Sequence, residues 1–78
     1  MARVVYYVVV SQGEWQIKYG EGKVAGPYAT QKAAIRAAVD AAHSTGKNGH
    51  DAQVMVQGSD SKWQTEWTYG NDPYPPRG

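Results

Sequence analysis

The chain has no cysteine and no phenylalanine among its 78 residues. Without cysteine it can form neither a disulfide framework nor a thiolate zinc site, the usual supports of very small domains. It also lacks the apolar run of about 20 residues that a membrane-spanning helix needs. The apolar start is short and β-branched and is followed by no small-residue cleavage site, so it does not resemble a signal peptide. We therefore expect one soluble, cytoplasmic domain stabilised by packing, either alone or shared with a second subunit.

Four segments have the composition of β-strands. Residues 4–10, VVYYVVV, are all β-branched or aromatic, which predicts a central strand with two apolar faces. EWQIKY (14–19) alternates polar and apolar residues, and the SQG before it predicts a hairpin. AQVMVQ (52–57) and KWQTEWTY (62–69) alternate in the same way around the turn GSDS. Alternation places four residues of the last segment on one face: Trp63, Thr65, Trp67 and Tyr69.

One helix is predicted between Thr30, a suitable N-cap, and Gly46, which is placed to end it in a left-handed conformation. The glycines and Pro27 of residues 20–29 predict a loop before it. The predicted fold class is α+β, ββαββ, with a four-stranded antiparallel sheet of order 2-1-3-4 and the helix packed on one face. Residues 1–69 form this single domain, and 70–78 form a proline-rich tail packed on or flanking it. The apolar stripe of the helix consists of Ala34, Ile35, Ala38, Val39, Ala41 and Ala42.

A single helix covers one face of the sheet, so the other face needs a different cover. Two candidates are the tail, folding back, and a second subunit. The first strand leaves open which side chains face the helix: Val5, Tyr7 and Val9, or Tyr6, Val8 and Val10. Five residues are expected to share one face of the sheet: Gln16, Lys18, Gln53, Met55 and Gln57. This face is either a recognition surface or an ordinary solvent-exposed sheet face.

Aromatic residues are dense, and such side chains are enriched in interface cores. Simple core packing accounts for Trp15, Tyr28 and Trp63, whereas Trp67, late in an edge strand, is the better contact residue. The exposed edge of the second or fourth strand is a further surface that could pair with a partner strand. The candidate interface residues are Tyr7, Met55, Trp67 and Tyr74.

Catalysis and metal binding have little support in the sequence. Only one group of residues suggests either: Asp40, His43, Ser44, His50 and Asp51. Asp40 and His43 are three apart on the predicted helix but on its solvent face, and the other histidine lies in a glycine-flanked loop. We therefore expect no enzyme activity, no cofactor and no metal.

Nucleic-acid binding is the alternative to a protein-interaction role. Lys32, Arg36 and Lys47 form a short basic stripe on and just beyond the helix. Basic groups beside aromatic side chains can hold single-stranded nucleic acids. However, the stripe is on the helix and the tryptophans are on the sheet, and the net charge is only +1. No membrane interaction is expected.

Four segments carry a resemblance to a known family: EWQIK, YATQKAAIRAAVDAA, VMVQGSDS and TYGNDPYPPRG. Together they resemble DUF2188, a family of small bacterial domains of unknown function. The resemblance covers nearly the whole chain, and the ending is its most specific part. The sequence departs from the family pattern at Ala33, where the family often has an acidic residue, at Ser61, where glycine is common, and at Trp67, where the family usually has a polar residue. The resemblance implies a bacterial or phage origin and a compact α+β fold, and it supplies no activity or cofactor.

The C-terminal segment GNDPYPPRG suggests a docking peptide because of its three prolines. Asn71 and Asp72 before Pro73 favour a turn, and Tyr69 and Tyr74 are placed to anchor it on the domain. The tail is therefore either a structural cover or a docking segment. We expect a non-enzymatic interaction module that binds a second copy or another protein.

Overall fold

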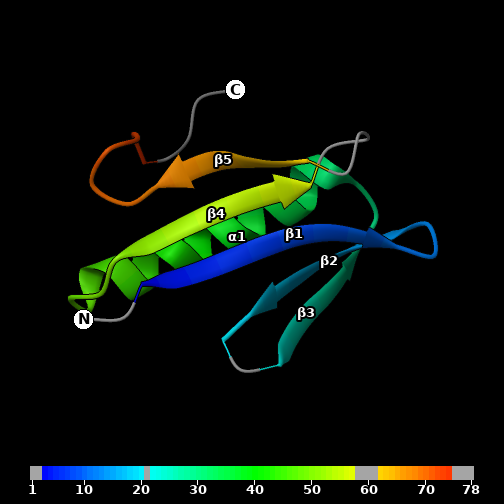
Figure 1. The fold of residues 1–78 in the computed structure, drawn as a ribbon, viewed down its shortest axis with the longest axis horizontal. Helices are drawn as coiled ribbons and strands as arrows, with labels where there is room; N and C mark the ends of the chain where they lie inside the picture. The colour runs from blue at the N-terminus through cyan, green and yellow to red at the C-terminus, as the bar shows by residue number, and fades with distance from the viewer. Residues whose placement is uncertain (1–2, 21, 58–61, 75–78) are drawn as a thin grey trace.

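The computed structural model describes residues 3–20, 22–57 and 62–74. These residues form a sheet with one helix lying across one of its faces, so the molecule has two layers (Figure 1). The predicted turn at 58–61 lies outside the described residues. The elements in chain order are β1 (Val4–Ser11), β2 (Glu14–Tyr19), β3 (Lys23–Tyr28), α1 (Gln31–Lys47), β4 (Ala52–Gln57) and β5 (Trp63–Thr68).

The sheet has five strands in the order β3-β2-β1-β4-β5, and it is mixed. β1 pairs antiparallel with β2 but parallel with β4, while β2–β3 and β4–β5 are antiparallel. The α+β class with one helix is confirmed, whereas the four-stranded, fully antiparallel sheet of order 2-1-3-4 is wrong. The extra strand β3 joins the sheet beside β2 and reverses the chain once more before α1. That reversal makes β4 run in the direction of β1.

β3 occupies the segment that was predicted to be a loop. Its glycine and proline are tolerated because β3 is an edge strand, and an edge residue does not need its backbone N–H for a second ladder. The pairing with β2 is irregular at this point, since Trp15 pairs with Tyr28 and Ile17 with Ala25. Gly26 and Pro27 are strand-breaking residues that lie in this bulge, so a prediction based on such residues assigns the segment to a loop.

The core lies between α1 and the helix-facing side of the sheet. Tyr6 and Val8 of β1 face the helix, which settles the side of β1 that the sequence left open. Val8, Val39 and Val54 are fully buried, and each contributes about 1.5–3 kcal/mol to stability by leaving water. The stripe of α1 is mostly alanine, so the helix lies close to β1 and β4. Its fully buried members are Ala34, Ala38, Val39 and Ala42.

A bulge in β5 changes the direction of its last tryptophan. Met55 pairs with Thr65 but the preceding Val54 pairs with Trp67, so one extra residue, Glu66, lies between the two pairs. One inserted residue turns the following side chains to the opposite face. The expectation that all four alternate residues share a face is therefore wrong. Trp67 points into the core and is 3 % exposed, while Trp63 points to the other side and is 43 % exposed.

The two ends of α1 differ in how well the sequence predicts them. Thr30 is the N-cap, and its hydroxyl accepts a hydrogen bond from the backbone N–H of Ala33, as expected. Gly46 does not end the helix: it is a buried helical residue, and Asn48 is the C-cap. A Cβ at Gly46 would overlap the ring of Tyr69. In the described residues, no helix is both long and apolar enough to cross a membrane.

Candidate functional site

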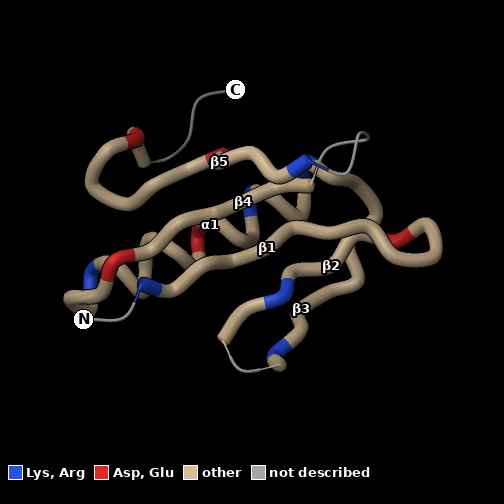
Figure 2. Tube along the Cα trace, viewed as in Figure 1, with Lys and Arg blue, Asp and Glu red and all other residues tan. Residues whose placement is uncertain are grey.

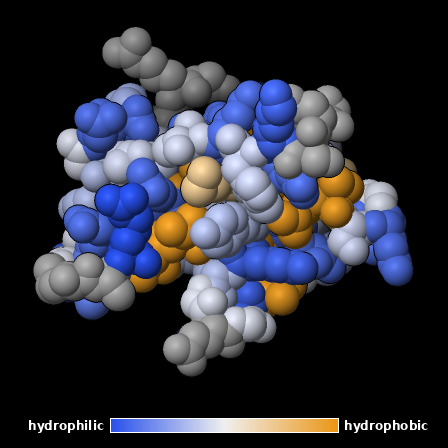
Figure 3. Space-filling model, viewed as in Figure 1, coloured by the Kyte–Doolittle hydropathy of each residue, from blue (hydrophilic) through white to orange (hydrophobic). Residues whose placement is uncertain are grey.

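The side of the sheet that faces away from α1, here called the open face, is the principal candidate site. In Figure 1 this face is toward the viewer, with α1 behind the strands. No other element of the described residues lies over it. Figure 3 shows the same side, where apolar patches alternate with polar surface along the sheet. Strand pairing places the following residues on it: Tyr7, Val9, Gln16, Lys18, Gln53, Met55, Gln57, Trp63 and Thr65.

Tyr7 and Trp63 form the exposed aromatic part of the open face. Their rings meet edge to face, with centroids 5.2 Å apart and planes at 76°. Tyr7 is 37 % exposed, and Met55 is its partner in β4. A shallow depression of about 510 Å³ adjoins the pair and is also lined by Val9, Lys18 and Gln57. The surface is therefore apolar in its middle and bordered by amide and ammonium groups.

The remainder of the open face is polar and carries few charges. Arg3 donates to the side-chain oxygen of Gln53 at 3.3 Å, and the amide of Gln53 donates to the Thr68 hydroxyl at 3.4 Å. These bonds cross β1, β4 and β5 at one end of the sheet. Charges of both signs are spread over the whole trace rather than gathered in one region (Figure 2). This surface supplies contact area and hydrogen-bonding groups.

The first residues of the tail lie on the helix side of the sheet. The indole N–H of Trp67 donates to the carbonyl oxygen of Pro73 at 2.9 Å. The Tyr74 ring stacks on His43 of α1, with centroids 3.7 Å apart and planes at 6°. The described part of the tail, up to Tyr74, therefore lies on the helix side and does not cover the open face, although the tail was one of the two covers that the sequence left open. Residues 75–78 lie outside the described residues.

Tyr74 is also held through its hydroxyl, which donates to the Asp40 carboxylate at 2.8 Å. This hydrogen bond is the main reason that the pKa of Tyr74 is raised above its ordinary value of 10.0, because an anion accepting the bond favours the protonated phenol. Arg36 contacts the same carboxylate at 3.3 Å and lies 5.8 Å from the centre of the Tyr74 ring. Asp40 thus links one turn of α1 to the tail.

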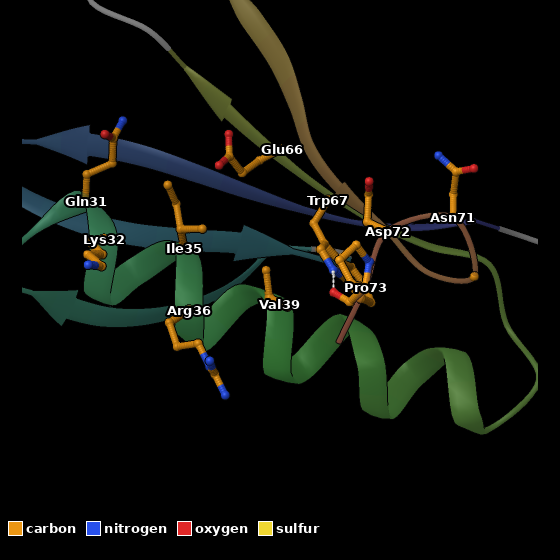
Figure 4. A pocket seen from close by; sticks show the side chains of 11 residues that line it. Gln31, Lys32, Ile35, Arg36, Val39, Glu66, Trp67, Asn71, Asp72 and Pro73 are labelled. Carbon is orange, nitrogen blue, oxygen red and sulfur yellow. Dashed lines mark hydrogen bonds between the residues drawn. The ribbon is translucent and has the colours of Figure 1, made fainter. Parts of the chain in front are cut away.

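A second concave surface, the α1–β5 groove, lies between the first half of α1 and the β5–tail segment. Its volume is about 1090 Å³. Figure 4 shows Ile35 and Val39 from the helix and Trp67 and Pro73 from the other side converging toward its floor. The walls differ in charge. Lys32 and Arg36 are on the helix, and Glu66 and Asp72 are on β5 and the tail.

The four candidate interface residues separate into two pairs. Tyr7 and Met55 lie together on the open face, whereas Trp67 and Tyr74 lie together on the helix side. Trp67 is a core residue because of the β5 bulge, so it offers no exposed contact surface. Trp63, which was expected in the core, takes that place on the open face. No pattern in residues 63–68 marks the bulge, so the exchange could not be seen in the sequence.

The open face contains the set of residues that alternation predicted for it. Gln16 pairs with Val9, Lys18 with Tyr7, and Met55 with Tyr7, so their side chains lie on the same side of the sheet as expected. Among the expected edge strands, β5 is an edge and β2 is not, since β3 pairs with its outer side.

The basic residues proposed for nucleic acid do not form one surface. Lys32 and Arg36 border the α1–β5 groove opposite two acids. Lys47 lies at the other end of α1, about 22 Å from Lys32 at 1.5 Å per residue. Arg36 is engaged by Asp40.

The residues considered for catalysis or metal binding are also dispersed. His43 packs among aromatic rings, while Asp40 contacts Arg36 and Tyr74. His50 and Asp51 lie exposed between α1 and β4. In the described part of the chain, no three histidine, aspartate or glutamate side chains are grouped as metal ligands.

A model of a known protein family matches most of the chain. Residues 6–69 match the model of DUF2188, described as an uncharacterized protein conserved in bacteria. The chain belongs to the DUF2188 family. The match includes all five strands from Tyr6 onward and the whole of α1, so this α+β fold is that of a DUF2188 domain. Searches among curated proteins and among solved structures returned no match for this DUF2188 chain.

Proposed function

We propose that the protein is a non-enzymatic interaction module that forms a homodimer through its open face. The observation that carries the proposal is the exposed pair Tyr7–Trp63, 37 % and 43 % exposed, beside Met55 on a sheet face without a covering element in the described residues. Exposed aromatic residues grouped on a flat surface are typical of protein contacts.

The face has the size and polarity that a second copy requires. A standard interface buries about 800 Å² on each partner. The molecule measures 34 × 30 × 20 Å, and the open face is normal to its shortest axis (Figure 1). Two sheets packed face to face about 10 Å apart would bury the aromatic pair of each copy against the other. Lys18 of β2 pairs with Tyr7 and is exposed, and its long side chain can extend so that its charge remains in water.

Nucleic-acid binding receives less support from the geometry. Two of its three candidate lysine and arginine residues face acids across a groove, and the third is at the far end of the helix. A phosphate backbone needs several cations along one path. We therefore do not propose this function.

The test is sedimentation velocity from about 1 to 500 μM with two matched variants. Thr65→Lys adds a charge to the open face, and Gln64→Lys adds it one residue earlier, on the opposite face of the same strand. We expect the wild type and Gln64→Lys to dimerise alike. Thr65→Lys should weaken dimerisation at least tenfold, because an unpaired charge would be buried. A wild type that stays monomeric throughout, or equal effects of both variants, contradicts the proposed dimer.

A further inference from the structure

We propose that the α1–β5 groove binds an extended peptide, which adds as a sixth strand to the outer edge of β5. The groove lies on the side of the sheet opposite the open face, so both surfaces can be occupied at once. This site does not depend on the proposed dimer.

Among the described residues, β5 provides an unpaired strand edge next to the groove. It is the last strand of the sheet and pairs only with β4 among the described residues. Near the tail this edge is already closed: the carboxylate of Asp72 accepts from the N–H of Thr68 at 2.8 Å, and the carbonyl oxygen of Thr68 accepts from Asn71 and Asp72. Antiparallel pairing turns the backbone groups of alternate residues outward, which places those of Thr65 and Trp63 along the remaining edge. An added strand would bond there.

The floor of the groove suits an apolar side chain from such a strand. Val39 and Trp67 beneath the groove are core residues, 0 % and 3 % exposed, so its accessible apolar surface comes from the half-buried Ile35 of α1 and the exposed Pro73 of the tail (Figure 4). The hydrogen bond from the Trp67 indole to Pro73 fixes the tail end, so the floor is formed before a ligand arrives. Side chains alternate along a strand, so every second residue of the peptide would enter the groove.

The charges of the walls indicate which polar side chain the peptide carries. A strand on the β5 edge would direct its groove-facing side chains toward α1, where Lys32 and Arg36 lie. Lys32 is exposed and makes no ion pair with another described residue, whereas Arg36 already contacts Asp40. An acidic side chain reaching Lys32 would gain a complementary charge. The occupant is therefore an extended peptide with apolar and acidic residues on its groove-facing side.

The probe is the synthetic peptide TVTETVT, acetylated and amidated at its ends, which presents Val, Glu and Val on one face and Thr on the other. Titration into ¹⁵N-labelled wild-type protein should shift the backbone amides of Thr65, Glu66 and Ile35 with saturation. The version TVTKTVT should bind more weakly. The version TVTEPVT, in which proline removes a strand hydrogen bond, should also bind more weakly.

The matched variants are Lys32→Glu and Lys23→Glu. Both reverse one exposed lysine, but Lys23 is in β3 at the opposite edge of the sheet. We expect Lys32→Glu to weaken binding of TVTETVT about fivefold, the effect of one exposed ion pair, and Lys23→Glu to leave it unchanged. The proposal is overturned by an absence of saturable shifts, by shifts confined to β3 or the open face, or by equal binding of the three peptides or the two variants.

Discussion

Tyr74 shows how one side chain can attach a terminal segment to a folded domain. Its ring lies flat on His43, and its hydroxyl donates to Asp40. Both partners are on the same face of α1, one turn apart, so a single residue contacts the helix through its apolar body and its polar tip. The contact depends on the protonated phenol, because a phenolate cannot donate to a carboxylate.

The dependence on protonation gives a prediction about alkaline pH. The pKa of Tyr74 is raised in the folded state, mainly by the hydrogen bond to Asp40. A raised folded-state pKa contributes stability that is complete below the unfolded-state pKa of about 10 and is lost as pH rises through the folded-state value. The free energy of unfolding, measured with urea between pH 7 and 11, should therefore fall more steeply in the wild type than in Tyr74→Phe.

Tyr7→Phe is the control for this experiment, since it removes a tyrosine hydroxyl from the opposite face of the sheet. Its pH dependence should follow that of the wild type. A Tyr74→Phe profile parallel to that of the wild type above pH 10 would show that the bond to Asp40 does not contribute to stability.

At the scale of elements, the molecule depends on irregular positions in otherwise regular segments. The extra residue in β5 places Trp67 in the core, and Gly46 inside α1 lets the ring of Tyr69 lie against the helix backbone. In both cases an element deviates from its most stable sequence or geometry so that an aromatic side chain can pack.

Gly46→Ala tests the close packing of α1 against Tyr69. In an exposed helix position alanine would be more stable than glycine by about 1 kcal/mol. Here the added methyl group overlaps the Tyr69 ring, so we expect a net loss of about 1–3 kcal/mol in the free energy of unfolding. Ser44→Ala, at an exposed position of the same helix, should be neutral or slightly stabilising. In a Tyr69→Ala background Gly46→Ala should no longer destabilise, and a persistent loss would contradict this explanation.

The elements that the sequence predicts are those with a regular period. β1, β2, β4, β5 and α1 follow from alternation or from the alanine-rich helical stripe, because a buried face imposes that period. The composition of the open face followed from the same alternation. β3 was missed because Gly26 and Pro27 are strand breakers everywhere except at an edge or a bulge. The reversed positions of Trp63 and Trp67 were missed because a bulge depends on pairing with β4, which local sequence does not reveal.

At the scale of the whole molecule, the described residues close one side of the sheet with α1 and the beginning of the tail and leave the other side open. Trp67 connects the sheet, the helix side and the tail, since its ring is in the core and its N–H bonds to Pro73. The Tyr74 ring stacks on His43 of α1, so the beginning of the tail packs as part of the helix layer. In the part of the chain that the structure describes, the open face is formed by strands alone.

Deletion of residues 70–78 should lower the stability of the whole domain. It removes the acceptor of the buried Trp67 N–H, which costs about 1–3 kcal/mol when such a donor is left unsatisfied. For a domain of this size each kcal/mol corresponds to a Tm lower by about 4–8 °C. A chain that ends at Tyr74 keeps every tail contact described above and is the control. An unchanged Tm for the longer deletion would mean that the tail does not stabilise the domain.

The parallel pairing of β1 with β4 determines when the chain can fold. Val4 pairs with Ala52 and Val8 with Val56, so the centre of the sheet joins segments separated by β2, β3 and all of α1. The meander of β1 to β3 can form early, but Tyr6 and Val8 stay in contact with water until α1 and β4 arrive. Closing this long loop costs conformational entropy, and burial of the core compensates for that cost only after β1 and β4 have paired. During synthesis we therefore expect no stable partial domain, and the chain acquires its fold in one late, cooperative step.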